Sequence, residues 1–151
     1  MKFVVYDDFY PIEIHYDKDI LYKINILKET KEKGGEKCVF SELINNQLNE
    51  YFSGKRKIFD IPHILKGTDF QLKVWNAINN IPYGKTKSYK EIAEYINYPK
   101  AYRAVGLACN KNPIPFIVPC HRVVGKNGKL TGYGGGIVLK DKLLRMEKIN
   151  E

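Results

Sequence analysis

The side chains with the clearest potential for chemistry lie in residues 112–124, where Cys120 and His121 stand side by side after a series of prolines. Each proline fixes φ and removes a backbone donor, so this segment is predicted to be neither a helix interior nor a central strand. We expect a stiff, mostly buried connection that holds the cysteine in one place. Neighbouring side chains of an extended segment point to opposite sides, so His121 would activate Cys120 through a local turn or through a water.

The charge of the chain favours a polyanionic partner. Its 151 residues carry a net charge of +8, which makes nucleic acid the first candidate and a lysine-rich surface kept soluble by its charge the alternative. Cys38, Cys109 and Cys120 form no close pair, which argues against a disulfide framework and a structural zinc site. No apolar run approaches about 18 residues and the N-terminus lacks the features of a signal peptide, so we expect a cytoplasmic protein without a membrane segment.

The first part of the chain is predicted to form a small antiparallel sheet followed by one helix. Residues 2–6, 12–16 and 20–27 read as strands, with turns at 7–11 and 17–19. Residues 28–37 are charged and contain adjacent glycines, which predicts a loop. A helix is expected over 41–52, with an apolar face of Leu43, Leu48, Tyr51 and Phe52. The polar connection 55–67 would separate two lobes, 1–60 and 61–151.

The second part is predicted to be mostly helical. Residues 68–71 and 88–91 each have the form of a capping box, and apolar residues follow at helical spacing. A turn at 97–99 precedes a third helix over 100–110, which would bury Ala104, Val105 and Ala108. A short helix, a turn and a helix with small inner residues are typical of a helix-turn-helix, although other helix pairs share the pattern.

Two segments after the Cys120 connection complete the chain. Residues 125–136 contain six glycines and one central aromatic residue, Tyr133, so this run could let backbone amides approach a ligand or could be a flexible surface loop. A final helix is predicted over 137–148, with an apolar face of Leu139, Leu143, Leu144 and Met146. Considered without other information, Glu147 would be interpreted as a solvated residue late in this helix.

These residues together resemble the signature of a known family, the O6-alkylguanine-DNA alkyltransferases. The matching residues are Asn112-Pro113, the run Pro119-Cys120-His121-Arg122-Val123-Val124, Tyr133 with Gly135-Gly136, and Glu147. The resemblance covers residues 68–148, whereas the first lobe is similar only in size and strand character. It implies an α+β fold, in which a small N-terminal antiparallel sheet lobe accompanies a mostly helical C-terminal lobe with a helix-turn-helix.

The resemblance also implies roles for the reactive residues. Cys120 would accept the alkyl group from O6 of guanine, once and irreversibly. A free thiol is mostly protonated at neutral pH, so His121 would take its proton through a water while Glu147 orients the imidazole. Asn112 would hold the loop by hydrogen bonds from its side chain to the backbone.

A pocket for the alkylated base is implied around these residues. Tyr89 would place its hydroxyl near N3 of the base, and Lys140 would support the polar side of the pocket. The carbonyls of Cys120 and Val123 would accept from the 2-amino group and so select guanine. The remaining pocket residues would be Tyr133 and Gly134 as a lid, Cys109 as a packing residue, and Pro115.

The implied partner is double-stranded DNA that contains O6-alkylguanine. The damaged base must leave the stack, and in the family the second helix of the motif enters the minor groove while an arginine fills the vacated place. Arg103 matches that arginine, and Ala101, Tyr102 and Ala104 lie beside it. No cofactor and no metal are implied, because the protein itself accepts the alkyl group. A monomer is expected, and activity on O4-methylthymine is left open.

Three other classes of protein share parts of this pattern. A damage sensor with the same DNA-binding helices would bind alkylated guanine without transfer, but sensors of that kind lack the acceptor cysteine. A cysteine hydrolase would use a Cys/His pair, but it would need an oxyanion hole and would leave the Arg103 helix unexplained. A structural or transcriptional basic protein would have no use for the Cys120 segment. The alkyltransferase interpretation accounts for most of the observations.

Overall fold

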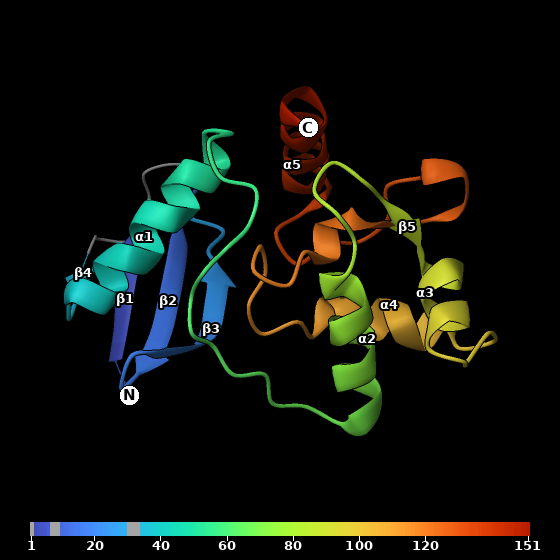
Figure 1. The fold of residues 1–151 in the computed structure, drawn as a ribbon, viewed down its shortest axis with the longest axis horizontal. Coiled ribbons are helices and arrows are strands. Elements are labelled where there is room, and N and C mark those ends of the chain that lie inside the picture. Colours follow the sequence, from blue (N-terminus) through green and yellow to red (C-terminus); the bar gives the residue numbers. More distant parts are fainter. Residues whose placement is uncertain (1, 7–9, 30–33) are drawn as a thin grey trace. The chain divides into compact units, whose positions relative to one another are not determined.

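The structure, a computed structural model, describes residues 2–6, 10–29 and 34–151. The chain divides into two compact units, Met1–Leu65 and Lys66–Glu151, which run from blue to green and from green to red in Figure 1. The division lies inside the connection 55–67, later in the chain than the predicted boundary at residue 60. None of the helices in the described ranges is long and apolar enough to cross a membrane.

A four-stranded antiparallel sheet forms the body of the first unit, in the order β3-β2-β1-β4. β1 spans Lys2–Tyr6, β2 Ile12–Asp17 and β3 Ile20–Ile26, so the three predicted strands are confirmed to within a residue. Alternate residues of β2 are buried, and α1 (Val39–Phe52) covers one face of the sheet (Figure 1). Of the predicted turns, 17–19 is present, with positive φ at Lys18 and Asp19. The turn predicted at 7–11 includes residues 7–9, which lie outside the described residues.

The loop predicted over 28–37 is wrong at its centre. Gly34–Gly35 form β4, which pairs with β1 at Val4 and Val5. Gly35 has a φ of 97°, and a Cβ there would collide with the backbone of Phe3. The adjacent glycines therefore permit the chain to approach the edge of β1, a long-range contact that local composition does not reveal. Residues 30–33 lie outside the described residues.

α1 spans Val39–Phe52 and begins two positions earlier than predicted. The Ser41 hydroxyl accepts a hydrogen bond from the Cys38 amide at 2.9 Å, which satisfies a donor at the helix start. Leu43, expected on the apolar face, is 41% exposed, whereas Phe40, Ile44 and Leu48 are buried. Leu48, Tyr51 and Phe52 are buried as predicted, so the prediction was wrong only at Leu43, whose neighbour Ile44 faces the core instead.

The second unit contains four helices and two very short strands. The helices are α2 (Asp69–Asn79), α3 (Tyr89–Tyr95), α4 (Tyr102–Asn110) and α5 (Ile137–Asn150). Both predicted capping boxes are confirmed: the Thr68 hydroxyl accepts from the Gln71 amide at 3.1 Å, and the Ser88 hydroxyl accepts from the Glu91 amide at 3.0 Å. These caps fix where α2 and α3 begin.

α4 corrects one prediction and adds a contact. The helix begins at Tyr102 rather than at residue 100, because Ala101 closes a turn by donating to the Tyr98 carbonyl at 2.8 Å. Ala104, expected to be buried, is half-buried. Trp75 on α2, which sequence reasoning did not single out, donates from its indole nitrogen to the Ala108 carbonyl at 2.9 Å and so ties α2 to α4.

Two features place the reactive segment. β5 (Lys87–Ser88) and β6 (Val123–Val124) pair in parallel, which connects the start of α3 to the residues just after Cys120. α5 buries Leu139 and Leu143 as predicted, whereas Leu144 and Met146 are half-buried. Its buried face also carries two charged residues, Lys140 and Glu147. Both therefore require polar partners inside the unit.

Candidate active site

The segment predicted to be mostly buried is buried in the structure. Every residue from 114 to 124 is buried, and Cys120–Arg122 form one turn of 3-10 helix. The side chain of Asn112 makes three hydrogen bonds to this segment. Its amide nitrogen donates to the Val118 carbonyl at 2.8 Å and to the Cys120 sulfur at 3.1 Å. Its oxygen accepts from the Ile114 amide at 3.0 Å. One side chain thus fixes both ends of the connection and contacts the thiol.

The Cys120 thiol is 5% exposed. Burial raises its pKa above the ordinary value, although the hydrogen bond from Asn112 and the charge of Lys140 oppose that effect. The resting thiol therefore keeps its proton at neutral pH, and a base is needed to form the nucleophilic thiolate.

A buried imidazole–carboxylate pair follows directly in the chain. His121 and Glu147 are 0% exposed, and Nε2 of His121 lies 2.6 Å from Oε2 of Glu147. Burial lowers the pKa of His121, while the interaction with Glu147 opposes that shift. Glu147 is ionised and can only accept, so Nε2 carries the proton of the neutral ring. In that tautomer Nδ1 bears the lone pair that can receive a proton.

Arg122 is a partner of Glu147 that was not among the predicted site residues. Its Nε donates to Oε1 of Glu147 at 2.8 Å and its Nη2 to Oε2 at 3.1 Å, while Nη1 donates to the Ile81 carbonyl at 2.8 Å. Burial alone would raise the pKa of Glu147, but His121 and Arg122 outweigh it and lower the pKa to about 2. The signals for it in the sequence were its place next to His121 and its membership of the run 119–124 that resembles the family signature.

A second cluster of polar residues, Tyr89, Thr131 and Lys140, connects α3 to α5. Lys140, 1% exposed, donates to the Tyr89 hydroxyl at 3.4 Å and to the Thr131 carbonyl at 3.2 Å. The Thr131 hydroxyl donates to Tyr89 at 2.9 Å. Burial raises the pKa of Tyr89 and lowers that of Lys140. The predicted pair Tyr89 and Lys140 is thus brought together, and Thr131 is a partner that the sequence did not reveal.

The predicted pocket residues differ in their burial and contacts. The Tyr133 ring lies edge-on to His121, with 6.5 Å between ring centroids. Gly134 is exposed, and a Cβ there would have nothing within 4 Å. Cys109, Pro115 and Val123 are all buried.

The predicted DNA-binding residues lie at the start of α4. Tyr102 and Arg103 are exposed, while Ala101 and Ala104 are half-buried. A cleft of about 330 Å³ is lined by both Arg103 and Tyr89. The exposed Arg103 and the Tyr89 that contacts Lys140 therefore border the same cleft.

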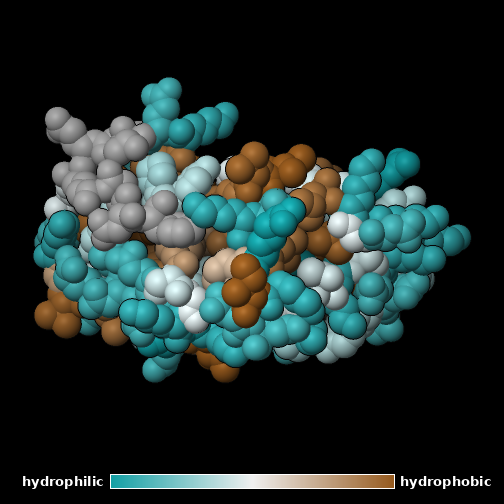
Figure 2. All heavy atoms as spheres, turned by 90° about the horizontal axis from the view of Figure 1, so that it is seen from above, coloured by the Kyte–Doolittle hydropathy of each residue, from teal (hydrophilic) through white to brown (hydrophobic). Residues whose placement is uncertain are grey.

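The face of the molecule drawn in Figure 2 carries both hydrophilic and hydrophobic residues. Hydrophilic residues cover most of the face drawn in Figure 2, with hydrophobic residues gathered in patches between them. Lys and Arg together number 25 against 17 Asp and Glu. This excess of positive charge favours association with a polyanion.

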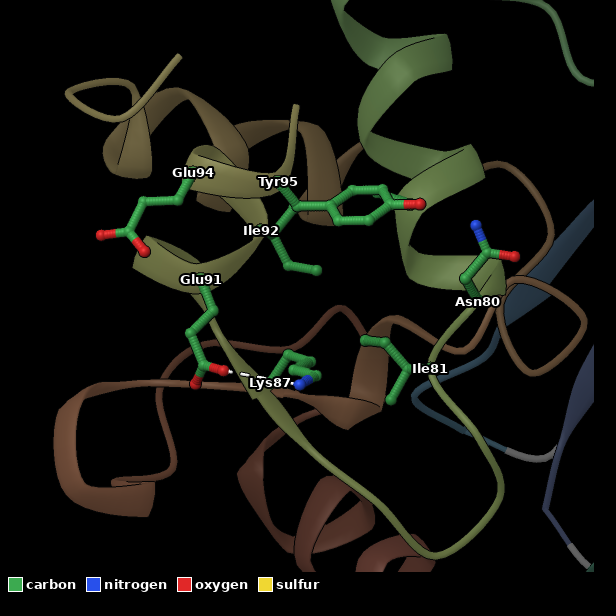
Figure 3. A pocket seen from close by; sticks show the side chains of 8 residues that line it. Asn80, Ile81, Lys87, Glu91, Ile92, Glu94 and Tyr95 are labelled. Carbon is green, nitrogen blue, oxygen red and sulfur yellow. Dashed lines mark ion pairs between the residues drawn. The ribbon is translucent and has the colours of Figure 1, made fainter. Parts of the chain in front are cut away.

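A separate cavity of about 430 Å³ lies between the end of α2 and α3, with Ile81 and Ile92 on its apolar side and an ion pair between Lys87 and Glu91 at its rim (Figure 3). None of the predicted site residues lines it. It contains no thiol or imidazole, so the site predicted from the sequence lies elsewhere, at the Cys120 turn.

Comparisons with known proteins show the family to which the chain belongs. The sequence profile described as "6-O-methylguanine DNA methyltransferase, DNA binding domain" matches residues 69–149. The chain is 49% identical over 152 residues to the methylated-DNA–protein-cysteine methyltransferase of Methanosarcina mazei, covering 97% of this chain and 96% of the relative.

Solved structures extend the likeness to three dimensions. The crystal structure of the O6-methylguanine methyltransferase of Mycobacterium tuberculosis matches with a TM-score of 0.89 and 45% identity, covering 100% of this chain and 95% of that one. The structure of OGT from the same species in complex with DNA matches with a TM-score of 0.83 and 46% identity, covering 93% and 88%. The chain belongs to the methylated-DNA–protein-cysteine methyltransferase family.

Proposed function

We propose that this chain repairs DNA by moving the methyl group of O6-methylguanine in a duplex to the sulfur of Cys120, once per protein molecule. The observation that carries the proposal is the reactive turn itself: a buried thiol is followed in the chain by a buried imidazole that is paired with a carboxylate. The family supplies the reaction class, and the geometry supplies the residues that would perform it.

Activation of the thiol would be a proton transfer to His121. The pKa of the imidazole is lowered by burial, so the ring is neutral and can act as a base at neutral pH. The imidazolium that results would remain hydrogen-bonded to Glu147. The thiolate would then attack the methyl carbon, forming the S–C bond as the bond from that carbon to O6 breaks.

Departure of the guanine would be assisted by Tyr89. Its hydroxyl accepts from Thr131 and from Lys140, so its own proton can be directed toward the base. A hydrogen bond to N3 would reduce the negative charge left on the leaving guanine. The carbonyls of Cys120 and Val123 would read the 2-amino group, with Tyr133 and Gly134 above the base.

DNA binding would use the start of α4. We propose that α3 and α4 act as a helix-turn-helix whose second helix lies in the minor groove, where sequence is read only weakly. Arg103 would fill the space left by the flipped base, and Ala101 and Ala104 would allow close approach. Tyr102, exposed beside them, would contact the groove wall. The net charge of +8 would attract the phosphates.

The setting of the reaction follows from its substrate. The protein itself accepts the methyl group, so no cofactor takes part in this scheme, and one monomer suffices for one lesion. The bacterial and archaeal relatives have their DNA in the cytoplasm, and we place this chain there too. Transfer from O4-methylthymine would require the same pocket to accept a pyrimidine, and it is measured by the same assay.

The test is the mass of the intact protein after mixing with a duplex that carries one O6-methylguanine. The expected result is a gain of a single methyl mass, absent in Cys120→Ser and retained in Cys38→Ser, the control at a cysteine of the first unit. Tight lesion-selective binding without any gain would instead indicate a damage sensor. A gain that persists in Cys120→Ser would move the acceptor to another residue.

A further inference from the structure

The hydroxyl of Tyr133 is a buried polar group that the reaction scheme does not use. Its oxygen is inaccessible to solvent and has no hydrogen-bond partner among the described residues, although its ring packs edge-on against His121. A buried hydroxyl without a partner costs about 1–3 kcal/mol. A phenylalanine would provide the same apolar wall without that cost, so the hydroxyl calls for a functional explanation.

The surroundings of the Tyr133 hydroxyl favour its protonated form, in which it can donate a hydrogen bond. Burial first, and then the charges of Cys120 and Glu147, raise the pKa of Tyr133 well above its ordinary value. The Tyr133 phenol therefore keeps its proton, and a hydrogen bond donated to a nearby acceptor would stabilise this buried group. The Cys120 thiol also accepts a hydrogen bond from Asn112 and is influenced by the charge of Lys140.

We propose that the Tyr133 hydroxyl donates a hydrogen bond to a water standing between the Cys120 thiol and Nδ1 of His121, and thereby positions that water for proton transfer. The thiol S–H bond breaks as the water gains this proton. One of the water's own protons forms the new Nδ1–H bond, which leaves a thiolate and an imidazolium. Tyr133 is unchanged and acts as a positioning residue. The inference rests on the proposed function, because it describes how the nucleophile of that reaction forms.

The proposal differs from a purely steric role in a measurable way. A ring that only covers the base would affect binding of the lesion and leave the titration of the thiol unchanged. A donor to the relay water would affect the formation of the thiolate even in the absence of DNA, because a hydrogen bond that favours the charged form lowers the apparent pKa.

The experiment compares Tyr133→Phe with Tyr95→Phe, a 67% exposed tyrosine on α3 that serves as the matched control. Single-turnover methyl transfer and alkylation of the free thiol by iodoacetamide are followed between about pH 5.5 and 9. For Tyr133→Phe we expect transfer at neutral pH to slow by about tenfold, and the midpoint of thiol alkylation to rise by about one pH unit. Lesion binding, measured in the Cys120→Ser background, should change less than about twofold.

Each other outcome would overturn the inference. Superimposable alkylation profiles for Tyr133→Phe and the parent would show that the hydroxyl plays no part in thiolate formation. A loss of binding as large as the loss of rate would indicate a stacking role alone. A lower thermal midpoint for Tyr133→Phe would mean that the hydroxyl has a structural partner. Alkylation by iodoacetamide needs no DNA, so it tests the relay even if the parent protein transfers no methyl group.

Discussion

Arg122 makes two hydrogen bonds to the carboxylate of Glu147: Nε donates to Oε1 at 2.8 Å, and Nη2 donates to Oε2 at 3.1 Å. The same carboxylate accepts from His121 at 2.6 Å. One buried negative charge is therefore shared between a guanidinium and an imidazole. Glu147 raises the pKa of His121, whereas the positive charge of the Arg122 guanidinium lowers it. The guanidinium therefore limits how far Glu147 can raise the pKa of this imidazole.

Replacing Arg122 with methionine should affect both stability and pH dependence. An uncompensated buried Glu147 costs about 3–5 kcal/mol, which urea unfolding will report. Without the guanidinium charge the pKa of His121 should rise, so the fall in transfer rate on acidification should begin at higher pH. Arg145→Met, at a 76% exposed side chain paired with Asp141, is the control and should cost less than about 1 kcal/mol. An unchanged rate profile for Arg122→Met would contradict the proposed balance.

Acid should destabilise the parent protein through Glu147. Its pKa is about 2 in the folded chain against an ordinary 4.5, so its contribution is complete above about pH 4.5 and is lost as pH falls toward 2. A shift of this size corresponds to about 3 kcal/mol. Glu147→Gln lacks this titration, so the difference in unfolding free energy between parent and variant should shrink over that range. A difference that stays constant would place the source of acid sensitivity elsewhere; Glu94→Gln, on the exposed side of α3, is the matched control.

Removing the side chain of Asn112 should loosen the reactive segment. Asn112→Ala leaves the Val118 carbonyl and the Ile114 amide without this partner, and we expect a loss of about 2 kcal/mol or more of unfolding free energy. The pKa of the Cys120 thiol should also rise, since the hydrogen bond from Asn112 lowers it. Thiol alkylation against pH measures that change. Asn46→Ala, at an exposed position of α1, should alter neither quantity.

Two neighbouring glycines should respond in opposite directions to alanine. A Cβ meets nothing within 4 Å at either Gly134 or Gly136, but only Gly136 has a positive φ, of 93°. Gly134→Ala should therefore stabilise the chain by about 0.4–1 kcal/mol by restricting the unfolded state. Gly136→Ala should destabilise it by more than about 1 kcal/mol, because the left-handed conformation is costly for alanine. Thermal unfolding of both variants tests this prediction, and equal shifts of the two unfolding midpoints would contradict it.

Local signals in the sequence determined much of the fold. The boxes at Thr68 and Ser88 fixed the starts of α2 and α3, because a cap depends only on residues within one turn. Alternation located the first three strands of the sheet to within a residue. The segment that contains Cys120 and His121, with its prolines, was correctly predicted to be buried.

Contacts between distant residues were decided by the tertiary structure alone. Arg122 and Glu147 are 25 positions apart, and Thr131 and Tyr89 are 42 apart; neither pairing has a local signature. β4 and the β5–β6 pair likewise depend on strands that meet only after folding. Glu147 illustrates the difference: in the sequence it is a charged residue late in a helix, and burial opposite His121 and Arg122 makes it the centre of the site. Residue type and short-range spacing specify helices, turns and the candidate cysteine, whereas burial and charge pairing arise from packing.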